Sequence, residues 1–368
     1  MSNQYKMRNH NIQEASMKRF FAGILSIALT AGLLAGCSGT QVHVCPPQEG
    51  AQETDTPAAP AAEGSVKTGL AVLTSLDGSA GAGAEEPGSA SFDVTLAAVT
   101  VDDAGVIDSC VIDGVQATVN FDASGAITTD LTAPIQTKNE LGENYGMKAY
   151  GGAAYEWNEQ AAALARYAVG KTVDELKNGA VDETGHAADA DLASVATIYL
   201  GGYVAAIEAA VEGAQHLGAQ QGDRLALTTT ASLGSSKSAG AEEEGLAQFD
   251  VNVAVTTFDG DTITSCLLDG VQPAVKFDAA GAVTSDLTAP VQTKNQLGEN
   301  YGMKAYGGAI AEWNEQAAAF AAYVTGKTAE EVSGIAVGER TQPTDADLAS
   351  SVTIAIGGFQ ELIAKAAR

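Results

Sequence analysis

The chain contains one long segment twice. The segment DLTAPIQTKNELGENYGMKAYGGAAYEWNEQAAA begins at Asp130, and its second copy begins at Asp286 with four differences in 34 aligned positions. The offset of 156 residues holds without a gap from Cys110 and Cys266 to the ends of both copies. Upstream the copies match more loosely, with one residue inserted at a turn. A repeat of this length indicates two copies of one domain, and recent duplication explains identities between them without a shared function.

Each copy begins with a strand pattern and continues with helical patterns. The segments SFDVTLAAVTV, VIDSCVIDG and QATVNFD alternate apolar and polar residues between Asp/Gly turns, which predicts a three-stranded antiparallel meander. AAYEWNEQAAALARYAV has helical spacing and stops at Gly170. Capping boxes at Thr172–Glu175 and Thr328–Glu331 predict a second short helix, and each copy ends in an apolar helix. The predicted fold class is α+β, with a small antiparallel sheet packed against helices in each of two tandem domains, 66–216 and 222–368.

The first residues have the pattern of an export signal. MKRFFAGILSIALTAGLLAGC combines basic Lys18 and Arg19 with an apolar run that ends at Cys37. This resembles the lipobox of bacterial lipoproteins, in which the cysteine is acylated and becomes the mature N-terminus. We therefore expect a signal peptide over 1–36, with Met17 as the alternative start, and a lipidated Cys37. The other reading is a single membrane helix.

Residues 37–65 and the overall charge complete this picture. The segment is rich in Pro, Ala, Gln and Glu, which predicts a disordered linker that tethers the domains to a membrane. The formal net charge of the whole chain is -27, and such a surface repels phosphate backbones. No nucleic-acid partner is expected. The predicted location is the extracytoplasmic face of a bacterial membrane in the cell envelope.

Several familiar catalytic patterns are missing or incomplete. VGKT and TGKT lack the earlier glycine of a phosphate-binding loop, because Ala165 and Ala321 stand there, and a helix end followed by a helix cap is favoured. No histidine is matched between the copies, and no GxSxG motif is present. Cys110 and Cys266 occupy equivalent strand positions, where buried free thiols are favoured over a reactive pair.

Two other groups leave alternatives open. Asp189, Asp191, Asp345 and Asp347 form acidic turns that can be solvated or can bind a hard cation. Trp157 and Trp313 fit the core of a helix-sheet domain, although a planar ligand also needs such rings. The polar, glycine-interrupted loops that contain Lys138 with Tyr145, and Lys294 with Tyr301, are of the type that often lines a site, and they leave a binding role open.

The strongest candidate site is a short motif that occurs once in each copy. An aspartate is followed three residues later by a serine and six residues later by a threonine: Asp191, Ser194 and Thr197, then Asp347, Ser350 and Thr353. This resembles the Asp-x-x-Ser/Thr-Gly-Ala-Thr motif of the FMN-binding domain family. In that family an ApbE-type FMN transferase joins the phosphate of FMN to the threonine through a phosphoester bond. Small neighbours suit such a reaction, because a nucleotide must approach the hydroxyl.

The first motif departs from the family pattern at one position and the second at two. The family's glycine is Val195 in the first copy and Ser351 in the second, and its alanine is Ala196 or Val352. A β-branched residue in place of glycine can impede the modification or mark a divergent group. The bland reading is that each threonine caps the following helix.

Taken together, the chain resembles the flavinylated surface lipoproteins of extracellular electron transfer. The resemblance implies covalent FMN on Thr197 and Thr353 in a lipid-anchored redox carrier, rather than a dedicated catalyst. It implies as partners the transferase, a membrane quinone oxidoreductase or other electron donor, an extracellular electron acceptor, and the membrane through the anchor. The alternative is a non-redox surface binding or structural lipoprotein that has lost the flavin.

Overall fold

A computed structural model describes residues 64–83 and 85–368. The predictions for the signal peptide, for Cys37 and for the linker up to residue 63 lie outside the described residues. No helix in the described part of the chain is long and apolar enough to cross a membrane.

The first copy folds into one antiparallel sheet and a set of short helices. Its strands are β1 (Lys67–Ser75), β2 (Gly88–Val101) and β3 (Ile107–Phe121), in the spatial order β1-β2-β3. The helical elements that follow are α2 (Lys138–Leu141), η1 (Gly142–Tyr145), α3 (Met147–Gly151), α4 (Trp157–Ala168), α5 (Val173–Gly179), α6 (Ala190–Val195) and α7 (Gly201–Glu212). Every neighbouring pair of strands is antiparallel. The predicted meander is wrong in its strands: VIDSCVIDG and QATVNFD form the single strand β3, and β1 supplies the third strand from outside the predicted segments. The Asp113-Gly114 pair does not turn the chain, because the Asp113 carboxylate accepts from the amides of Gly114 and Asn139.

The second copy repeats this order with divided strands. Its strands are β4 (Arg224–Ser232), β5 (Gly245–Gln248), β6 (Asp250–Asp259), β7 (Thr262–Val271) and β8 (Ala274–Phe277). Its helical elements are α8 (Lys294–Leu297), η2 (Gly298–Tyr301), α9 (Met303–Gly307), α10 (Trp313–Val324), α11 (Ala329–Ser333), α12 (Ala346–Ala349) and α13 (Gly357–Ala366). Pro273 stands where the first copy has Ala117. Because proline has no amide hydrogen, it interrupts this strand and divides it into β7, which pairs with β6, and β8, which pairs with β5.

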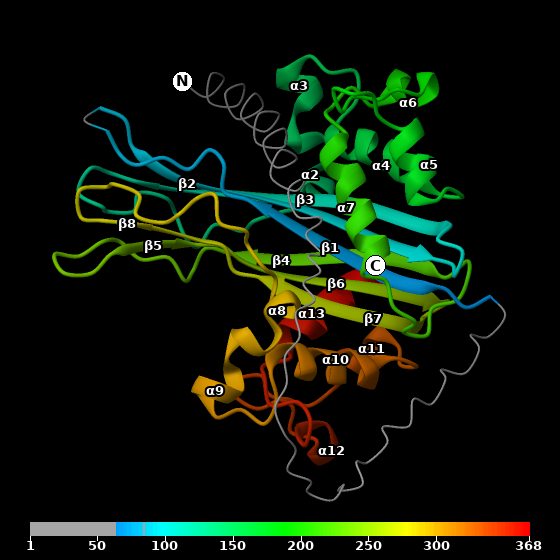
Figure 1. The fold of residues 1–368 in the computed structure, drawn as a ribbon. Coiled ribbons are helices and arrows are strands. Elements are labelled where there is room, and N and C mark those ends of the chain that lie inside the picture. Colours follow the sequence, from blue (N-terminus) through cyan, green and yellow to red (C-terminus); the bar gives the residue numbers. More distant parts are fainter. Residues whose placement is uncertain (1–63, 84) are drawn as a thin grey trace, which may run out of the picture.

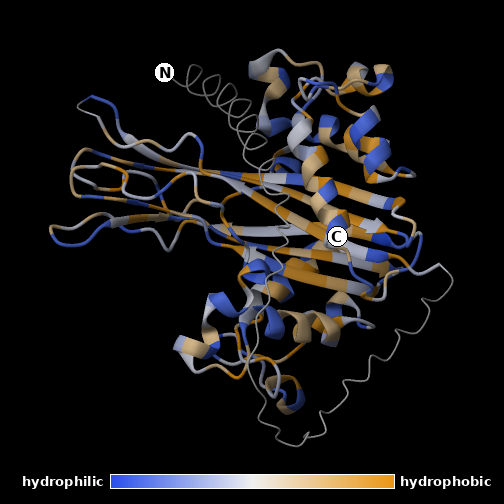
Figure 2. Cartoon of the chain, in the orientation of Figure 1, coloured by the Kyte–Doolittle hydropathy of each residue, from blue (hydrophilic) through white to orange (hydrophobic). Residues whose placement is uncertain are grey.

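The two copies stack as four layers. Figure 1 shows the helices of the first copy on one outer face, the helices of the second copy on the opposite outer face, and two layers of strands between them. One layer is the sheet β1-β2-β3, and the other consists of the sheet β4-β6-β7 and the two-stranded sheet β5-β8. Three apolar cores follow from this order, one between each sheet and its helices and one between the sheets. Figure 2 shows hydrophobic residues along the central strands and on the helix faces against them.

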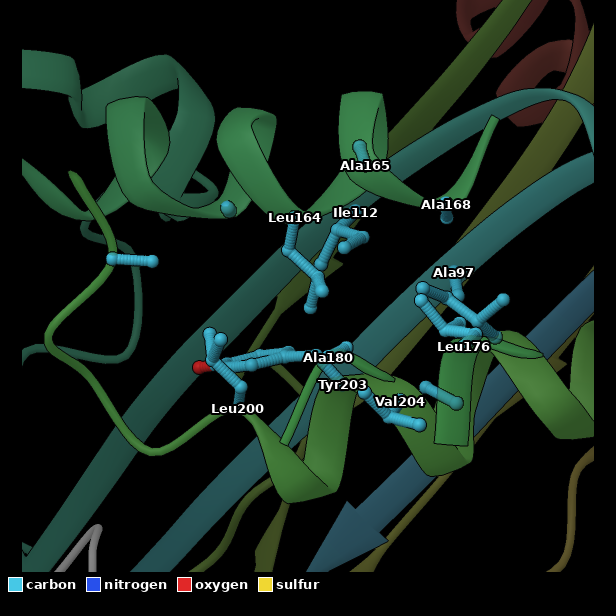
Figure 3. Packing of buried hydrophobic residues seen from close by; sticks show 14 of the residues in the cluster. Ala97, Ile112, Leu164, Ala165, Ala168, Leu176, Ala180, Leu200, Tyr203 and Val204 are labelled. Atoms are coloured by element: carbon cyan, nitrogen blue, oxygen red, sulfur yellow. The ribbon is translucent and has the colours of Figure 1, made fainter. Parts of the chain in front are cut away.

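The core of the first copy illustrates how the helices are held. Leu164 and Ala168 of α4 lie over β3, and Tyr203 and Val204 of α7 lie over the remaining strands (Figure 3). All of these residues are buried, and Trp157 at the start of α4 belongs to the same core. The prediction that Trp157 and Trp313 are core residues is confirmed.

The core between the sheets contains side chains from both copies. Phe121 of β3 and Phe277 of β8 are equivalent residues of the repeat, and their rings stack with centroids 3.9 Å apart and an interplanar angle of 1°. Their equivalence means that this contact lies on a pseudo-two-fold axis. The hydroxyls of Thr68 and Ser265 also meet across the sheets at 2.7 Å.

Reciprocal backbone contacts confirm the two-fold relation. The amide of Ala82 donates to the carbonyl of Gly281 at 2.7 Å, and the equivalent amide of Ala239 donates to the carbonyl of Gly125 at 2.8 Å. A side chain on Gly125 would collide with the Ala239 methyl group, and one on Gly281 would collide with the Ala82 methyl group. The interface is therefore isologous, as in a symmetric homodimer, although one chain provides both halves.

The predicted α+β class is confirmed, and so are the capping boxes at Thr172–Glu175 and Thr328–Glu331. The predicted long helix begins later than its sequence pattern, at Trp157 instead of near Ala153. The reason is Glu156, whose carboxylate caps the helix and also accepts hydrogen bonds from the amides of Met147 and Lys148. This second set of contacts fixes the preceding residues as a separate loop.

Candidate functional site

Each candidate threonine lies in a bend between a short helix and the last long helix of its copy. In the first copy α6 begins after Asp189, whose carboxylate accepts from the amides of Asp191 and Leu192 at 3.0 Å. The hydroxyl of Ser194 donates to the carbonyl of Asp191 at 2.7 Å. These contacts satisfy both ends of a helix that is too short to be stable alone.

A buried glutamine holds the bend that carries Thr197. Gln160 of α4 is fully buried, and its Oε1 accepts from the amide of Thr197 at 2.7 Å and from the amide of Ile198 at 3.1 Å. The Thr197 hydroxyl also points to this oxygen, at 3.3 Å. At its other end, Nε2 of Gln160 donates to the carbonyl of Tyr155 at 2.9 Å. One side chain thus joins the threonine bend to the loop before α4.

The second copy has the same arrangement. Oε1 of the fully buried Gln316 accepts from the amides of Thr353 and Ile354 at 2.7 Å and 3.2 Å, and from the Thr353 hydroxyl at 3.0 Å. Its Nε2 donates to the carbonyl of Ala311 at 2.8 Å. Ser350 donates to the carbonyl of Asp347 at 2.7 Å, as its counterpart does in the first copy.

All six residues of the two motifs are exposed: Asp191, Ser194, Thr197, Asp347, Ser350 and Thr353. The structure brings each aspartate, serine and threonine together in one turn and bend of its own copy. Figure 1 places α6 and α12 at opposite ends of the four-layer stack, so the two motifs do not form one shared site. Each threonine is exposed to solvent as a residue, while its hydroxyl bonds to the buried glutamine beneath it.

The bland reading, in which the threonines cap the following helices, is wrong. The N-cap of α7 is Leu200 and the N-cap of α13 is Ile356, and neither has a side-chain capping bond. The hydroxyls of Thr197 and Thr353 bond to the buried glutamines instead.

The missing glycine of the motif does not strain the backbone. A glycine is required where φ is positive, and Thr341 is the one described non-glycine residue with such an angle. Val195 and Ser351 therefore adopt φ values open to any residue. Val195 is half-buried and Ser351 is exposed. The motif glycine is therefore not needed for backbone conformation. Its remaining effect would be to leave more space beside the threonine than Val195 or Ser351 leaves.

The surroundings of the two motifs differ at one pair of positions. In the first copy Gly185 has φ 80°, and a side chain there would collide with the ring of Tyr199, which lies two residues after Thr197. In the second copy these positions are Thr341, with φ 61°, and Ala355. In the first copy the turn residue is the smaller of the pair, Gly185 beside Tyr199, whereas in the second copy the turn residue is the larger, Thr341 with Ala355.

The glycine-interrupted loops place their lysines inside the protein. Lys138 is 2% exposed, and its Nζ lies 3.9 Å from Asp93 Oδ1 and 5.1 Å from the centroid of the Trp157 ring. Burial is the largest effect and lowers the pKa of Lys138, but Asp93, Tyr145, Tyr203 and Asp113 together outweigh it and raise the pKa. Lys138 is thus a structural cation beneath the indole, rather than a group presented to a ligand.

The equivalent Lys294 lies 4.9 Å from the centroid of the Trp313 ring. It is half-buried. Burial lowers its pKa, and Asp250 and Asp269 oppose that shift. The directions differ because four groups, Asp93, Tyr145, Tyr203 and Asp113, favour the charged form of Lys138, whereas only two, Asp250 and Asp269, favour that of Lys294.

The thiols and acidic turns show no catalytic arrangement. Cys266 is buried, as predicted, whereas Cys110 is partly exposed and lines a cavity of about 300 Å³ between α4 and β3. Burial of the sulfur raises the pKa of each thiol to about 12, which leaves both in the unreactive neutral form. Asp189 and Asp345 are helix caps, and among residues 64–83 and 85–368 no group of three or more metal-ligating side chains is arranged to hold an ion.

The residues that sequence reasoning missed are Gln160 and Gln316. Their signal was present, because Gln160 lies three residues after Trp157 and one before Ala161, on the face of the helix that also carries Leu164. A polar residue on an apolar helix face must find hydrogen-bond partners inside the protein. Which backbone groups it meets depends on the tertiary fold, since the bend is 37 residues away in sequence.

Comparisons of the chain with models of known protein families, with curated protein sequences and with solved structures find no match in any of the three.

Proposed function

We propose that the chain is a lipid-anchored extracytoplasmic electron-transfer protein that carries FMN covalently on Thr197 and Thr353. The observation that carries the proposal is the same in both copies. An exposed threonine, in the Asp-x-x-Ser-x-x-Thr spacing of a flavinylation motif, lies in a bend fixed by a buried glutamine. A modifying enzyme needs such an accessible and fixed nucleophile.

The geometry suits a carrier better than a catalyst. Each motif is an open bend on an outer layer, where a bound flavin remains accessible to redox partners. The flavin would supply the electron chemistry, and the protein would supply its position and the surrounding charge. Asp191 and Asp347 add negative charge beside the two threonines, which disfavours the anionic reduced flavin and lowers its reduction potential.

The proposed donor and acceptor are those that the family resemblance implies. A flexible tether at a lipidated Cys37 would let both flavins move between a membrane quinone oxidoreductase and an extracellular acceptor. The rival function is a non-redox binding or structural lipoprotein, and Val195 and Ser351 in place of the motif glycine are the observation that favours it.

The deciding experiment is the intact mass of the chain after co-expression with an ApbE-type transferase and its export route. We expect two increments of FMN less water, with yellow colour that survives denaturation. Thr197→Ala and Thr353→Ala should each remove one increment, whereas Thr197→Ser is the matched control that retains a hydroxyl.

One increment would leave a single redox domain beside a structural copy. No increment, with an active transferase that modifies a control substrate, would overturn covalent flavinylation and favour the binding lipoprotein.

A further inference from the structure

We propose that Gln160 and Gln316 are positioning residues for the transfer of a flavin phosphate to Thr197 and Thr353. This inference rests on the function proposed above and adds how the chain itself prepares the acceptor hydroxyl. The first observation is the difference in burial: both glutamines are fully buried, and both threonines are exposed. Each glutamine therefore acts from beneath the bend.

The amide oxygen fixes the backbone of the bend in both copies. A carbonyl oxygen has two lone pairs, and three donors converge on Oε1 of each glutamine. In the first copy the amides of Thr197 and Ile198 lie at 2.7 Å and 3.1 Å, and the Thr197 hydroxyl lies at 3.3 Å. In the second copy the Thr353 hydroxyl, at 3.0 Å, is closer than the amide of Ile354, at 3.2 Å. The amides thus hold each bend in place, and each hydroxyl turns from this oxygen when it passes its proton to a base of the transferase.

The opposite end of the glutamine adds a second constraint. Nε2 of Gln160 donates to the carbonyl of Tyr155, and Nε2 of Gln316 donates to the carbonyl of Ala311. Because α4 and α10 are capped and packed on their sheets, the bend inherits the rigidity of a core helix. A reacting group held in one orientation gains rate through the entropy already lost.

The proposed step balances without any contribution from the amide as a base. The threonine Oγ1 attacks the flavin-side phosphorus of a flavin dinucleotide, and an O–P ester bond forms. The phosphoanhydride P–O bond breaks, and a nucleoside monophosphate leaves. The hydroxyl proton passes to a base of the transferase, because a glutamine side chain cannot accept it.

The test compares both threonines in the same molecules. The full chain is incubated with purified transferase and flavin adenine dinucleotide, and the initial rate at each threonine is read from peptide masses. In Gln160→Leu we expect the rate at Thr197 to fall at least tenfold, with the rate at Thr353 unchanged. Gln316→Leu should give the reciprocal result.

Two further variants separate positioning from stability. Gln160→Glu keeps an acceptor oxygen for the amides but, when ionised, has no hydrogen to donate to the Tyr155 carbonyl, so it should restore the rate at Thr197 only in part. Leu164→Ala removes a fully buried side chain of the same helix that does not bond to the bend. If Leu164→Ala lowers the unfolding temperature as much as Gln160→Leu does, it should still leave the rate at Thr197 unchanged.

If the rate at Thr197 in Gln160→Leu equals the rate at Thr197 in the wild-type chain, the positioning role is overturned while flavinylation stays intact. An equal loss in Leu164→Ala would overturn it too, since stability alone would then explain the effect. If neither threonine of the wild-type chain is modified, the flavin proposal and this inference both fall.

Discussion

At the scale of single residues, the two copies solve one packing problem in opposite ways. The tight turn before α6 uses Gly185, and the aromatic ring of Tyr199 covers it. The corresponding turn before α12 uses Thr341 in the same left-handed region, with the small Ala355 opposite. The second copy therefore carries backbone strain that the first copy does not.

We predict that Thr341→Gly stabilises the protein by about 1 kcal/mol, because it relieves a β-branched residue at positive φ. The reverse change, Gly185→Thr, should cost at least about 2 kcal/mol, because its Cβ would meet the Tyr199 ring. Denaturant unfolding measures both values. A loss of stability in Thr341→Gly would show that Thr341 gains more from its contacts than its backbone costs.

At the scale of elements, the segment between η1 and α4, which contains α3, depends on one buried carboxylate. Glu156 caps α4 and accepts from the amides of Met147 and Lys148 at 2.8 Å and 3.1 Å. Glu312 repeats all of these contacts in the second copy. A single side chain thus decides where the loop ends and where the helix begins.

We predict that Glu156→Ala lowers the free energy of unfolding by about 2 to 3 kcal/mol, because it leaves several buried amides without an acceptor. Amide exchange should speed up at Met147 and Lys148 while exchange at Met303 and Lys304 in the second copy stays slow. Glu159→Gln is a suitable control for the loss of one charge, since it keeps the reciprocal capping oxygen. Unchanged exchange at Met147 would show that the loop is held by other contacts.

The helices and strands were largely predictable from the sequence, and the site only in part. Alternating residues predicted the antiparallel strands β2 and β3 but divided β3 in two and left out β1. The capping boxes predicted the start of α5 and α11, because that signal is local. The threonines were found by their spacing. Their glutamine partners were not, since Gln160 and Thr197 meet through tertiary packing. The burial of Lys138 was missed for the same reason, because its position beneath the Trp157 ring depends on how the loop packs.

At the scale of the whole molecule, the two copies share a core and so depend on each other for stability. Phe121 and Phe277 stack across the pseudo-two-fold axis, and the surrounding strands of both sheets bury their inner faces together. The chain has two tryptophans, Trp157 in the first copy and Trp313 in the second. Each therefore reports on the unfolding of one copy.

We predict that Phe121→Ala lowers the unfolding midpoint reported by Trp313 as much as the midpoint reported by Trp157. The cost should be about 3 to 5 kcal/mol, the range for removing a buried phenylalanine side chain. Fluorescence of Trp157→Phe and Trp313→Phe backgrounds separates the two signals. Lys148→Ala, which breaks a partly exposed ion pair with Glu159, should move neither midpoint appreciably.

A Trp313 transition that stays in place in Phe121→Ala would contradict the shared core and indicate two independently folding copies.

The shared core also limits how this chain can evolve. After a duplication, a second copy is commonly free to diverge or to be deleted. Here each copy buries the apolar inner face of the other copy's strands. Loss of either copy would expose that sheet face and invite aggregation. Divergence is therefore confined to the two outer layers. Those layers carry Thr197 and Thr353, so the copies can acquire different surface properties while selection on folding keeps both of them in the gene.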